Sequence, residues 1–470
     1  MFMKHKILFL LIALPTILSA QIEGLWHTSF RVLGMSKQLD LKIDTLRETL
    51  SANFWEPGGK NPRKISLDTI YFQNDTLRFS WEAGHLTFAG KHFQQGDSIS
   101  GNFEQSGIRW RSNFTRTIQE KKEILRPQEP QSPFDYTIEE IKCVNDDVTL
   151  AGTLTLPKNS QNNYPIVVLA SGSGPQNRDC EILGHKPFWV IADYLAKNGI
   201  GCLRFDDRGI GESTGSYSKA TLVDFGNDLN SCVTTLLSNP RFKNHPIGVV
   251  GHSEGGMHAL IAAKNNKQIA FVIELASVGT SGEEVLIQQQ YLIPRKSGAS
   301  EELALWNKGV YEGACGILKK YKGDKRTKKL DDFLTDEYNN APTEIKESTN
   351  LLNFKLSIQL LLNNDWGRQF IQFNTKVYLK NIEVPILVIN GSQDIQVPAT
   401  QSQEGFKNNF SIASKPQSKI ILLEGLNHLF QTCESCAVDE YGELEETFSE
   451  KALQEILIWI SAILEEPAKR

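Results

Sequence analysis

A chain of 470 residues is too long for one ordinary domain and suits two or three. Its hydrophobic fraction of 40% provides for a sizeable core, and its formal net charge of −5 excludes the global basic field typical of proteins that bind nucleic acid. The sequence signatures of DNA- and RNA-binding modules are also missing, so we expect no nucleic-acid partner.

Residues 1–20 have the pattern of a secretory signal peptide. Two lysines precede an apolar run at residues 7–14, and small residues at 18–20 offer a cleavage site. An uncleaved anchor is the alternative, but Pro15 interrupts the apolar run short of the about 20 residues that a membrane-spanning helix needs. We therefore expect this segment to be removed and the protein to be exported, periplasmic or secreted, without stable membrane insertion.

Residues 21–117 alternate apolar and polar residues in short runs. Four such runs, separated by turn signals, span residues 39–43, 65–70, 77–81 and 99–103. A period of two with one apolar face predicts an antiparallel sheet or small barrel of roughly eight strands. We expect four tryptophans of this segment in its core rather than stacked on a carbohydrate: Trp26, Trp55, Trp81 and Trp110. The charged, proline-containing residues 118–135 predict a linker.

Residues 136–470 show continuous apolar runs that alternate with helical stretches. The runs include residues 166–170, 201–205, 246–250, 270–276 and 385–390. Strands that are apolar on both faces predict a mostly parallel sheet covered by helices on both sides, an α/β domain. Residues 282–380 interrupt this alternation with polar, helical sequence, which we interpret as an inserted cap. The basic stretch at residues 319–329 is typical of a solvated helix face, with recruitment of an anionic substrate group as the alternative.

A glycine-flanked serine follows the apolar run at residues 246–250. Residues 251–255, Gly-His-Ser-Glu-Gly, have the G-x-S-x-G pattern, and a helix-forming stretch comes next. A strand, a sharp turn at a serine and a helix are the context in which this pattern marks a nucleophile. Because the pattern alone also recurs by chance at tight turns, Ser253 needs partners elsewhere in the chain.

A serine nucleophile needs a base within hydrogen-bond reach and a third group that orients the base. Asp394 follows the apolar run that ends at Asn390, and His428 follows the next run, at residues 420–424. Loops at the carboxyl ends of parallel strands converge on one edge of a sheet, and the order serine, aspartate, histidine is the one that this architecture uses. Taken singly, the aspartate could cap a helix and the histidine could bond a loop. Together they predict a catalytic triad.

Acyl transfer also requires donors for the oxyanion. The backbone N–H of Glu254, directly after the serine, is the first expected donor. The second is expected from the glycine-containing loop at residues 171–179, where Pro175 cannot donate. We choose Ser173, with Gly174 in reserve; a mere tight turn is the alternative for this loop.

Two further patterns are assigned structural roles. The glycine-rich turn at residues 207–213 lacks the spacing of a phosphate loop, and we expect Arg208 to brace the site. Cys433 and Cys436 form a C-x-x-C, but a zinc site would need further ligands at suitable spacing, so a local disulfide is favoured. The sequence therefore predicts no metal and no cofactor.

The motifs of residues 136–470 together resemble those of the α/β-hydrolases, in the serine-aminopeptidase-like esterase branch. The matching residues are Gly172-Ser173-Gly174-Pro175, Asp207-Arg208-Gly209-x-Gly211, Gly251-x-Ser253-x-Gly255-Gly256, Asp394-x-x-Val397-Pro398 and Asn427-His428. The β domain before them is similar, in strand pattern and domain order, to the lipocalin-like module of two-domain bacterial carboxylesterases. This resemblance implies the α/β-hydrolase fold, a Ser253–His428–Asp394 triad, a helical cap over the site and hydrolysis of short acyl esters through an acyl-enzyme. In many relatives a histidine begins the oxyanion loop, where this chain has Ser171.

The expected activity is therefore that of a carboxylesterase, a serine hydrolase that cleaves small carboxylic esters of short to medium acyl chains. A serine peptidase or aminopeptidase that acts on short peptides is the nearest alternative, because the same triad cleaves amides. A non-catalytic protein that binds a glycan or a lipid through its β domain and cap is the alternative from another class.

Overall fold

The computed structural model describes residues 22–32, 35–46, 49–55, 64–82, 86–93, 97–105, 108–116, 124–158, 163–409 and 417–465. The predicted signal peptide lies outside these residues. Contacts divide the chain into two compact units, Met1–Glu123 with Tyr338–Ser357 and Ile124–Glu337 with Ile358–Arg470. The domain bounds drawn from the sequence stay predictions. None of the described helices is both long enough and apolar enough to span a bilayer.

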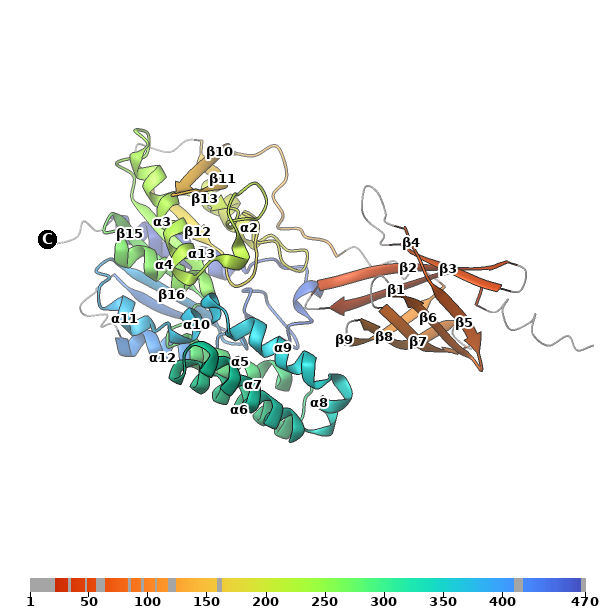
Figure 1. The fold of residues 1–470 in the computed structure, drawn as a ribbon. Helices are drawn as coiled ribbons and strands as arrows, with labels where there is room; N and C mark the ends of the chain where they lie inside the picture. The colour runs from red at the N-terminus through yellow and green to blue at the C-terminus, as the bar shows by residue number, and fades with distance from the viewer. Residues whose placement is uncertain are drawn as a thin grey trace, which may run out of the picture. The chain divides into compact units, whose positions relative to one another are not determined.

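The first unit contains a curled antiparallel sheet, coloured red to orange in Figure 1. Its described strands are β1 (Gly24–Val32), β2 (Met35–Leu46), β3 (Thr49–Trp55), β4 (Lys64–Ser66), β5 (Thr69–Gln73), β6 (Thr76–Trp81), β7 (Leu86–Phe93), β8 (Ser98–Gln105) and β9 (Ile108–Thr115). They lie in the order β4-β3-β2-β1-β9-β8-β7-β6-β5. The first and last strands therefore pair in the middle of the sheet, and β4 and β5 lie at its ends.

Alternate side chains of these strands form one aromatic core. Along β7, buried and exposed residues alternate without a break, as the period of two predicts. The rings of Phe79 and Phe88 stack with their centroids 4.9 Å apart. Trp26 is fully buried and donates from Nε1 to the carbonyl of Ile22 at 2.8 Å, which confirms its core position. The side chains of Trp55 and Trp110 lie outside the described part of the chain.

The second unit contains an eight-stranded sheet in the order β10-β11-β13-β12-β14-β15-β16-β17. Its strands are β10 (Tyr136–Asn145), β11 (Val148–Pro157), β12 (Ile166–Ala170), β13 (Gly201–Phe205), β14 (Ile247–His252), β15 (Ile269–Leu275), β16 (Ile386–Gly391) and β17 (Lys419–Leu423). The β10–β11 and β11–β13 pairs are antiparallel, and every later pair is parallel. All residues of β12, β14 and β16 are buried, which explains their continuous apolar sequence.

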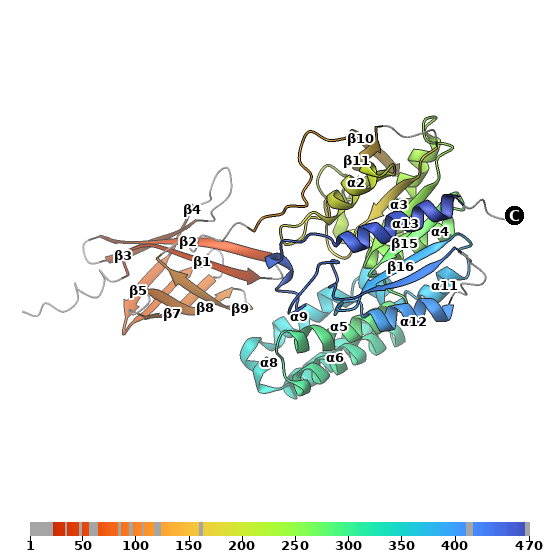
Figure 2. The same ribbon diagram turned by 180° about the vertical axis from the view of Figure 1, so that it is seen from behind.

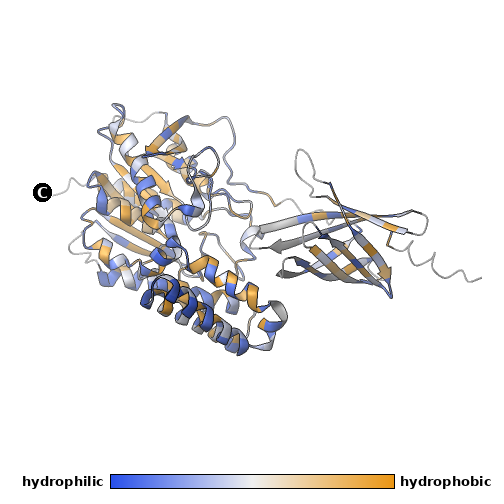
Figure 3. Ribbon diagram, viewed as in Figure 1, coloured by the Kyte–Doolittle hydropathy of each residue, from blue (hydrophilic) through white to orange (hydrophobic). Residues whose placement is uncertain are grey.

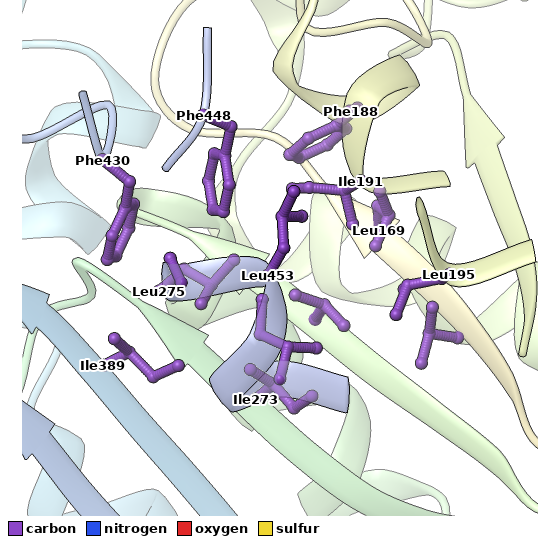
Figure 4. Close-up of a cluster of buried hydrophobic side chains, with 14 of the residues drawn as sticks. Leu169, Phe188, Ile191, Leu195, Ile273, Leu275, Ile389, Phe430, Phe448 and Leu453 are labelled. Atoms are coloured by element: carbon purple, nitrogen blue, oxygen red, sulfur yellow. The ribbon is translucent and has the colours of Figure 1, made fainter. Parts of the chain in front are cut away.

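Helices cover both faces of this sheet (Figures 1 and 2). Four of them are α2 (Pro187–Lys197), α3 (Leu222–Ser238), α4 (Glu254–Asn265) and α13 (Glu450–Glu465). Figure 4 shows Phe188 and Leu195 of α2 and Leu453 of α13 packed over Ile273 and Leu275 of β15. Helices α3 and α4 pack against each other on the opposite face. The remaining short elements are α12 (Ala399–Asn409) and the 3-10 helices η3 (Tyr217–Lys219) and η4 (Tyr441–Glu443).

Seven helices separate β15 from β16 in the sequence. They are α5 (Gly282–Lys296), α6 (Glu301–Lys320), α7 (Gly323–Asn339), α8 (Thr343–Ser348), α9 (Leu351–Leu362), α10 (Asp365–Gln372) and α11 (Thr375–Leu379). Ser281 and Glu284 form a capping box at the start of α5, and Asn364 caps α10. Figure 3 shows α7, which contains much of the basic stretch, as mostly hydrophilic, in agreement with a solvated face. Within that stretch Lys328 pairs with Asp332 along α7.

Candidate active site

Ser253 lies at the turn between β14 and α4. Its backbone has φ 58° and ψ −122°, and a positive φ is strained for a residue with a side chain. The Ser253 N–H donates to the carbonyl of Leu275 on β15 at 2.8 Å, which ties the turn to the neighbouring strand. The strand, sharp turn and helix expected around this serine are therefore present.

Glycines allow the chain to pack closely around this turn. A Cβ on Gly251 would lie 2.2 Å from the carbonyl oxygen of Gly255, and a Cβ on Gly255 would lie 2.2 Å from that of Ala170. Neither position accepts a side chain, because atoms cannot approach so closely. A Cβ on Gly172 would lie 3.1 Å from the Cβ of Ser253. The loop after β12, residues 171–179, hereafter the oxyanion loop, thus lies directly against the serine.

His428 and Asp394 are hydrogen-bonded to each other. The Nδ1–H of His428 donates to Oδ2 of Asp394 at 2.8 Å, and both side chains are almost fully buried. The other oxygen of Asp394 accepts the backbone N–H groups of Gln396 and Val397, each at 2.8 Å. The carboxylate is fixed on one side by its own loop and on the other by the imidazole. This arrangement leaves Nε2 of His428 as the ring nitrogen available to a reacting group.

His252, the residue before Ser253, contacts the loop that carries His428. Its Nε2–H donates to the backbone carbonyl of His428 at 2.9 Å, and the two ring centroids are 4.9 Å apart. Burial, and to a smaller extent the neighbouring His428, lowers the pKa of His252 to about 3. His252 is therefore neutral at physiological pH and acts as a hydrogen-bond donor.

A cavity of about 310 Å³ brings the predicted residues together. Ser253, His428, Ser173 and Glu254 line it, and Asp394 lies behind His428 outside the lining. The reserve oxyanion donor, Gly174, is not among the lining residues. Most of the remaining wall is apolar and includes Val278, Val285, Leu286, Leu361, Leu362 and Phe370. The described hydrogen bonds of this region do not include one between Ser253 Oγ and His428, although both side chains face the same space.

Asp207 anchors the oxyanion loop, a role that we did not predict. Its carboxylate accepts the hydroxyl of Ser171 at 3.0 Å and the backbone N–H of Gln176 at 2.9 Å. Burial raises the pKa of Asp207 to about 7, and these two hydrogen bonds oppose the rise. Ser171, in the position where relatives often have a histidine, thus ties the start of the loop to the end of β13. Arg208 instead pairs with Asp228 of α3 and does not line the cavity.

The side chain of Glu254 is the second unpredicted contact. We expected its backbone N–H to matter more than its carboxylate, but the residue is 1% exposed and the carboxylate accepts three hydrogen bonds from side chains. The donors are the hydroxyl of Ser173 at 2.6 Å, Nε1 of Trp366 at 2.8 Å and Nε2 of His258 at 3.2 Å. The sequence held no sign of this network, because Trp366 lies 112 residues away on α10.

The C-x-x-C pair follows His428 on the same loop. Cys433 and Cys436 form a disulfide, which agrees with the favoured interpretation. The nearby carboxylate of Glu440 accepts the backbone N–H groups of Glu434, Ser435 and Cys436. The disulfide and the carboxylate of Glu440 together fix the conformation of this loop.

Comparison with known proteins shows which family the chain belongs to. Residues 188–432, just over half of the chain, match the family described as serine aminopeptidase, S33. The chain belongs to this family. Its second unit has the α/β-hydrolase fold that the strand pattern and motifs predict, in the serine-aminopeptidase-like branch. The antiparallel β unit precedes it in the sequence.

This S33 family member is also similar to individual proteins. It is 24% identical over 311 residues to esterase EstD of Thermotoga maritima. The matched region covers 66% of this chain and 65% of the esterase, so the chain spans less than two thirds of that protein. Among solved structures, the Pyrococcus furiosus esterase Pf2001 has 18% identity and a TM-score of 0.41, with 70% of this chain and 91% of that chain covered. The hypothetical protein PA2218 of Pseudomonas aeruginosa has 18% identity and a TM-score of 0.43, with coverage of 74% and 99%.

Proposed function

We propose that this protein is a carboxylesterase that cleaves esters of short to medium acyl chains through an acyl-enzyme. Ser253 Oγ attacks the ester carbonyl carbon, while Nε2 of His428 takes the hydroxyl proton. The bond to the alcohol oxygen then breaks, and His428 gives its proton to the departing alkoxide. Water attacks the acyl-serine by the same route, which releases the carboxylic acid and restores the hydroxyl of Ser253.

The proposed supporting groups follow from their positions. Asp394 holds the imidazole in the tautomer with Nδ1 protonated and stabilises the imidazolium that forms during attack. The backbone N–H groups of Glu254 and Ser173 would hold the oxyanion, because one follows the nucleophile and the other belongs to the loop that packs on it. Small-molecule esters fit the apolar cavity, whose walls exclude water from the acyl group.

The observation that carries this proposal is the shared cavity. Ser253, in a strained turn, and His428, already hydrogen-bonded to a buried aspartate, face one largely apolar space. A strained serine, an oriented base and a largely apolar pocket suit acyl transfer, and they occur here at the same point. The similarity to a protein named as an esterase agrees with it.

The test uses p-nitrophenyl esters and a fluorophosphonate probe on the full chain. We expect release of p-nitrophenol, labelling of Ser253, and loss of both by orders of magnitude in Ser253→Ala with circular dichroism unchanged. Aminoacyl p-nitroanilides assayed in parallel decide between the ester and the peptidase alternatives: faster amide cleavage would replace the esterase with a peptidase. Folded protein that neither labels nor hydrolyses any of these substrates would favour the non-catalytic binding protein.

We further propose that the protein is exported and that residues 1–20 are removed. The proposal rests on the lysines, the apolar run and the small residues at the cleavage site. Expression of the full-length chain in a bacterium, followed by N-terminal sequencing of the periplasmic fraction, tests it. A mature N-terminus at Gln21 is the expected result, and recovery of uncleaved chain in the cytoplasm would refute it.

A further inference from the structure

The carboxylate of Glu254 joins two parts of the second unit that both border the cavity. Its Oε2 accepts the hydroxyl of Ser173 from the oxyanion loop, and its Oε1 accepts the indole N–H of Trp366 from α10. His258, one helical turn further along α4, donates to the same Oε1. The ring of His258 in turn packs on Phe225 of α3 at a centroid distance of 5.2 Å.

Hydrogen bonds fix the oxyanion loop before Ser173, after Ser173 and at Ser173 itself. Asp207 holds Ser171 and the backbone N–H of Gln176. Between these two anchors Gly174 has φ 93°, a conformation that places little constraint of its own on the chain. The hydrogen bond from Ser173 to Glu254 is therefore the contact that sets the tip of the loop, and the tip carries the proposed second oxyanion donor.

A buried carboxylate makes this contact depend on its other donors. Hydrogen bonds to an ionised group are stronger than neutral ones, and a buried charge that loses a donor is costly. If the indole of Trp366 is removed, Oε1 keeps only the longer bond from His258. The carboxylate can recover a partner only by shifting, and a shift moves Ser173 with it.

We propose that Glu254 is a positioning residue that couples α10 of the inserted helices to the oxyanion hole through Trp366 and Ser173. Docking of the indole on one carboxylate oxygen holds the other oxygen where it fixes the Ser173 hydroxyl, and so aims the Ser173 backbone N–H at the oxyanion. This inference rests on the proposed function. It explains how α10, which lines the cavity through Trp366, would influence the oxyanion hole.

A double-mutant cycle between Trp366→Phe and Ser173→Ala tests the coupling without altering Glu254. Each substitution removes one donor and keeps most of the packing. We expect each to lower kcat for p-nitrophenyl acetate by about 10-fold to 100-fold, the loss of one hydrogen bond to a charged group, with KM within about twofold. The double variant should be no slower than the slower single variant. Glu254→Gln should reproduce this loss, and Ser173→Thr, which keeps the hydroxyl, should restore most of kcat.

The matched control is Trp306→Phe on α6, which removes another indole from the inserted helices but does not line the cavity. It should leave kcat unchanged. Additive losses in the cycle, or effects on KM alone, would overturn the coupling while ester hydrolysis by the wild type leaves the proposed function intact.

The rate of fluorophosphonate labelling provides a second reading of the same cycle, because phosphonylation of Ser253 uses the same oxyanion donors. It keeps the test decisive if the acetate is a poor substrate. Absence of both turnover and labelling in the wild type would overturn the proposed function and this inference with it.

Discussion

Glu274 is a carboxyl group buried in the middle of β15. It is 0% exposed, and among the described residues neither of its oxygens has a hydrogen bond of good geometry. Burial raises its pKa to about 8, and the nearby Ser277 hydroxyl offsets only part of the rise. We therefore predict that Glu274 is protonated in the folded protein at neutral pH.

This protonation makes stability depend on pH in a known direction. Between the ordinary pKa of 4.5 and the folded value of about 8, the folded chain keeps a proton that the unfolded chain has lost. Raising the pH through this window therefore favours unfolding, by about 1.4 kcal/mol per pH unit and about 5 kcal/mol at full extent. The stabilisation is complete below pH 4.5 and is lost as the pH passes 8.

Glu274→Gln removes the titration while it keeps the shape of the side chain. Relative to wild type, the variant should gain about 4 kcal/mol between pH 5 and pH 9. For a unit of roughly 330 residues, unfolding entropy near 0.7 kcal/mol/K converts this gain to about 6 °C in Tm. Scanning calorimetry of both proteins at the two pH values measures it.

A matched control separates this effect from general charge removal. Glu424→Gln removes a carboxylate from an exposed position of the same unit and should show no such pH-dependent gain. A relative change below about 1 kcal/mol for Glu274→Gln would refute the argument that burial keeps Glu274 protonated.

Three further outcomes are expected. Asp394→Asn should lower kcat by about 10³-fold to 10⁴-fold with little change in KM, because the imidazole of His428 loses its tautomer; an equal rise in KM would contradict this role in steady-state assays. In a graded ester panel, each methylene added to the acyl chain should raise kcat/KM by about fourfold until the 310 Å³ cavity is full. Leu286→Trp should move that limit to shorter acyl chains. A kcat/KM that does not depend on chain length would place the acyl group elsewhere. Replacing Cys433 and Cys436 together by serine should cost at most about 2 kcal/mol in urea unfolding, since the closed loop is short, while ester turnover persists; loss of turnover in the folded variant would show that the disulfide holds His428.

Much of the fold was predictable, because buried parallel strands leave a strong signal. The runs at residues 166–170, 201–205 and 385–390 coincide with β12, β13 and β16 to within one residue. A strand buried on both faces is mostly apolar along its length, so it is distinct from the more polar sequence around it. The sheet of the first unit was predicted as antiparallel, but with roughly eight strands instead of nine described ones, because β4 and β5 are too short for their alternation to be counted separately.

The site was predictable where backbone topology alone brings residues together. Ser253, Asp394 and His428 follow three strands whose carboxyl ends lie on one edge of the sheet, so their order along the chain sufficed to group them. Asp207 also directly follows a strand, and the same reasoning could have assigned it to the site. The contact between Glu254 and Trp366 depends on how an inserted helix packs, and strand order says nothing about that.

Gly256, the glycine that directly follows the motif at residues 251–255, shows how a buried carboxyl group and a motif depend on each other. A Cβ at Gly256 would lie 2.1 Å from Oε2 of Glu274 on β15 and 1.8 Å from Oγ of Ser277, two residues after β15 ends, so these side chains and not the turn itself exclude a larger residue here. Glu274 consequently occupies the space beneath the first turn of α4. The apolar run of β15 contains one carboxyl residue, and the motif of α4 contains one glycine more than the turn requires. Each of these departures accommodates the other, which is why substitution at Gly256 should displace α4, the helix that carries Glu254 and one of its three donors, His258.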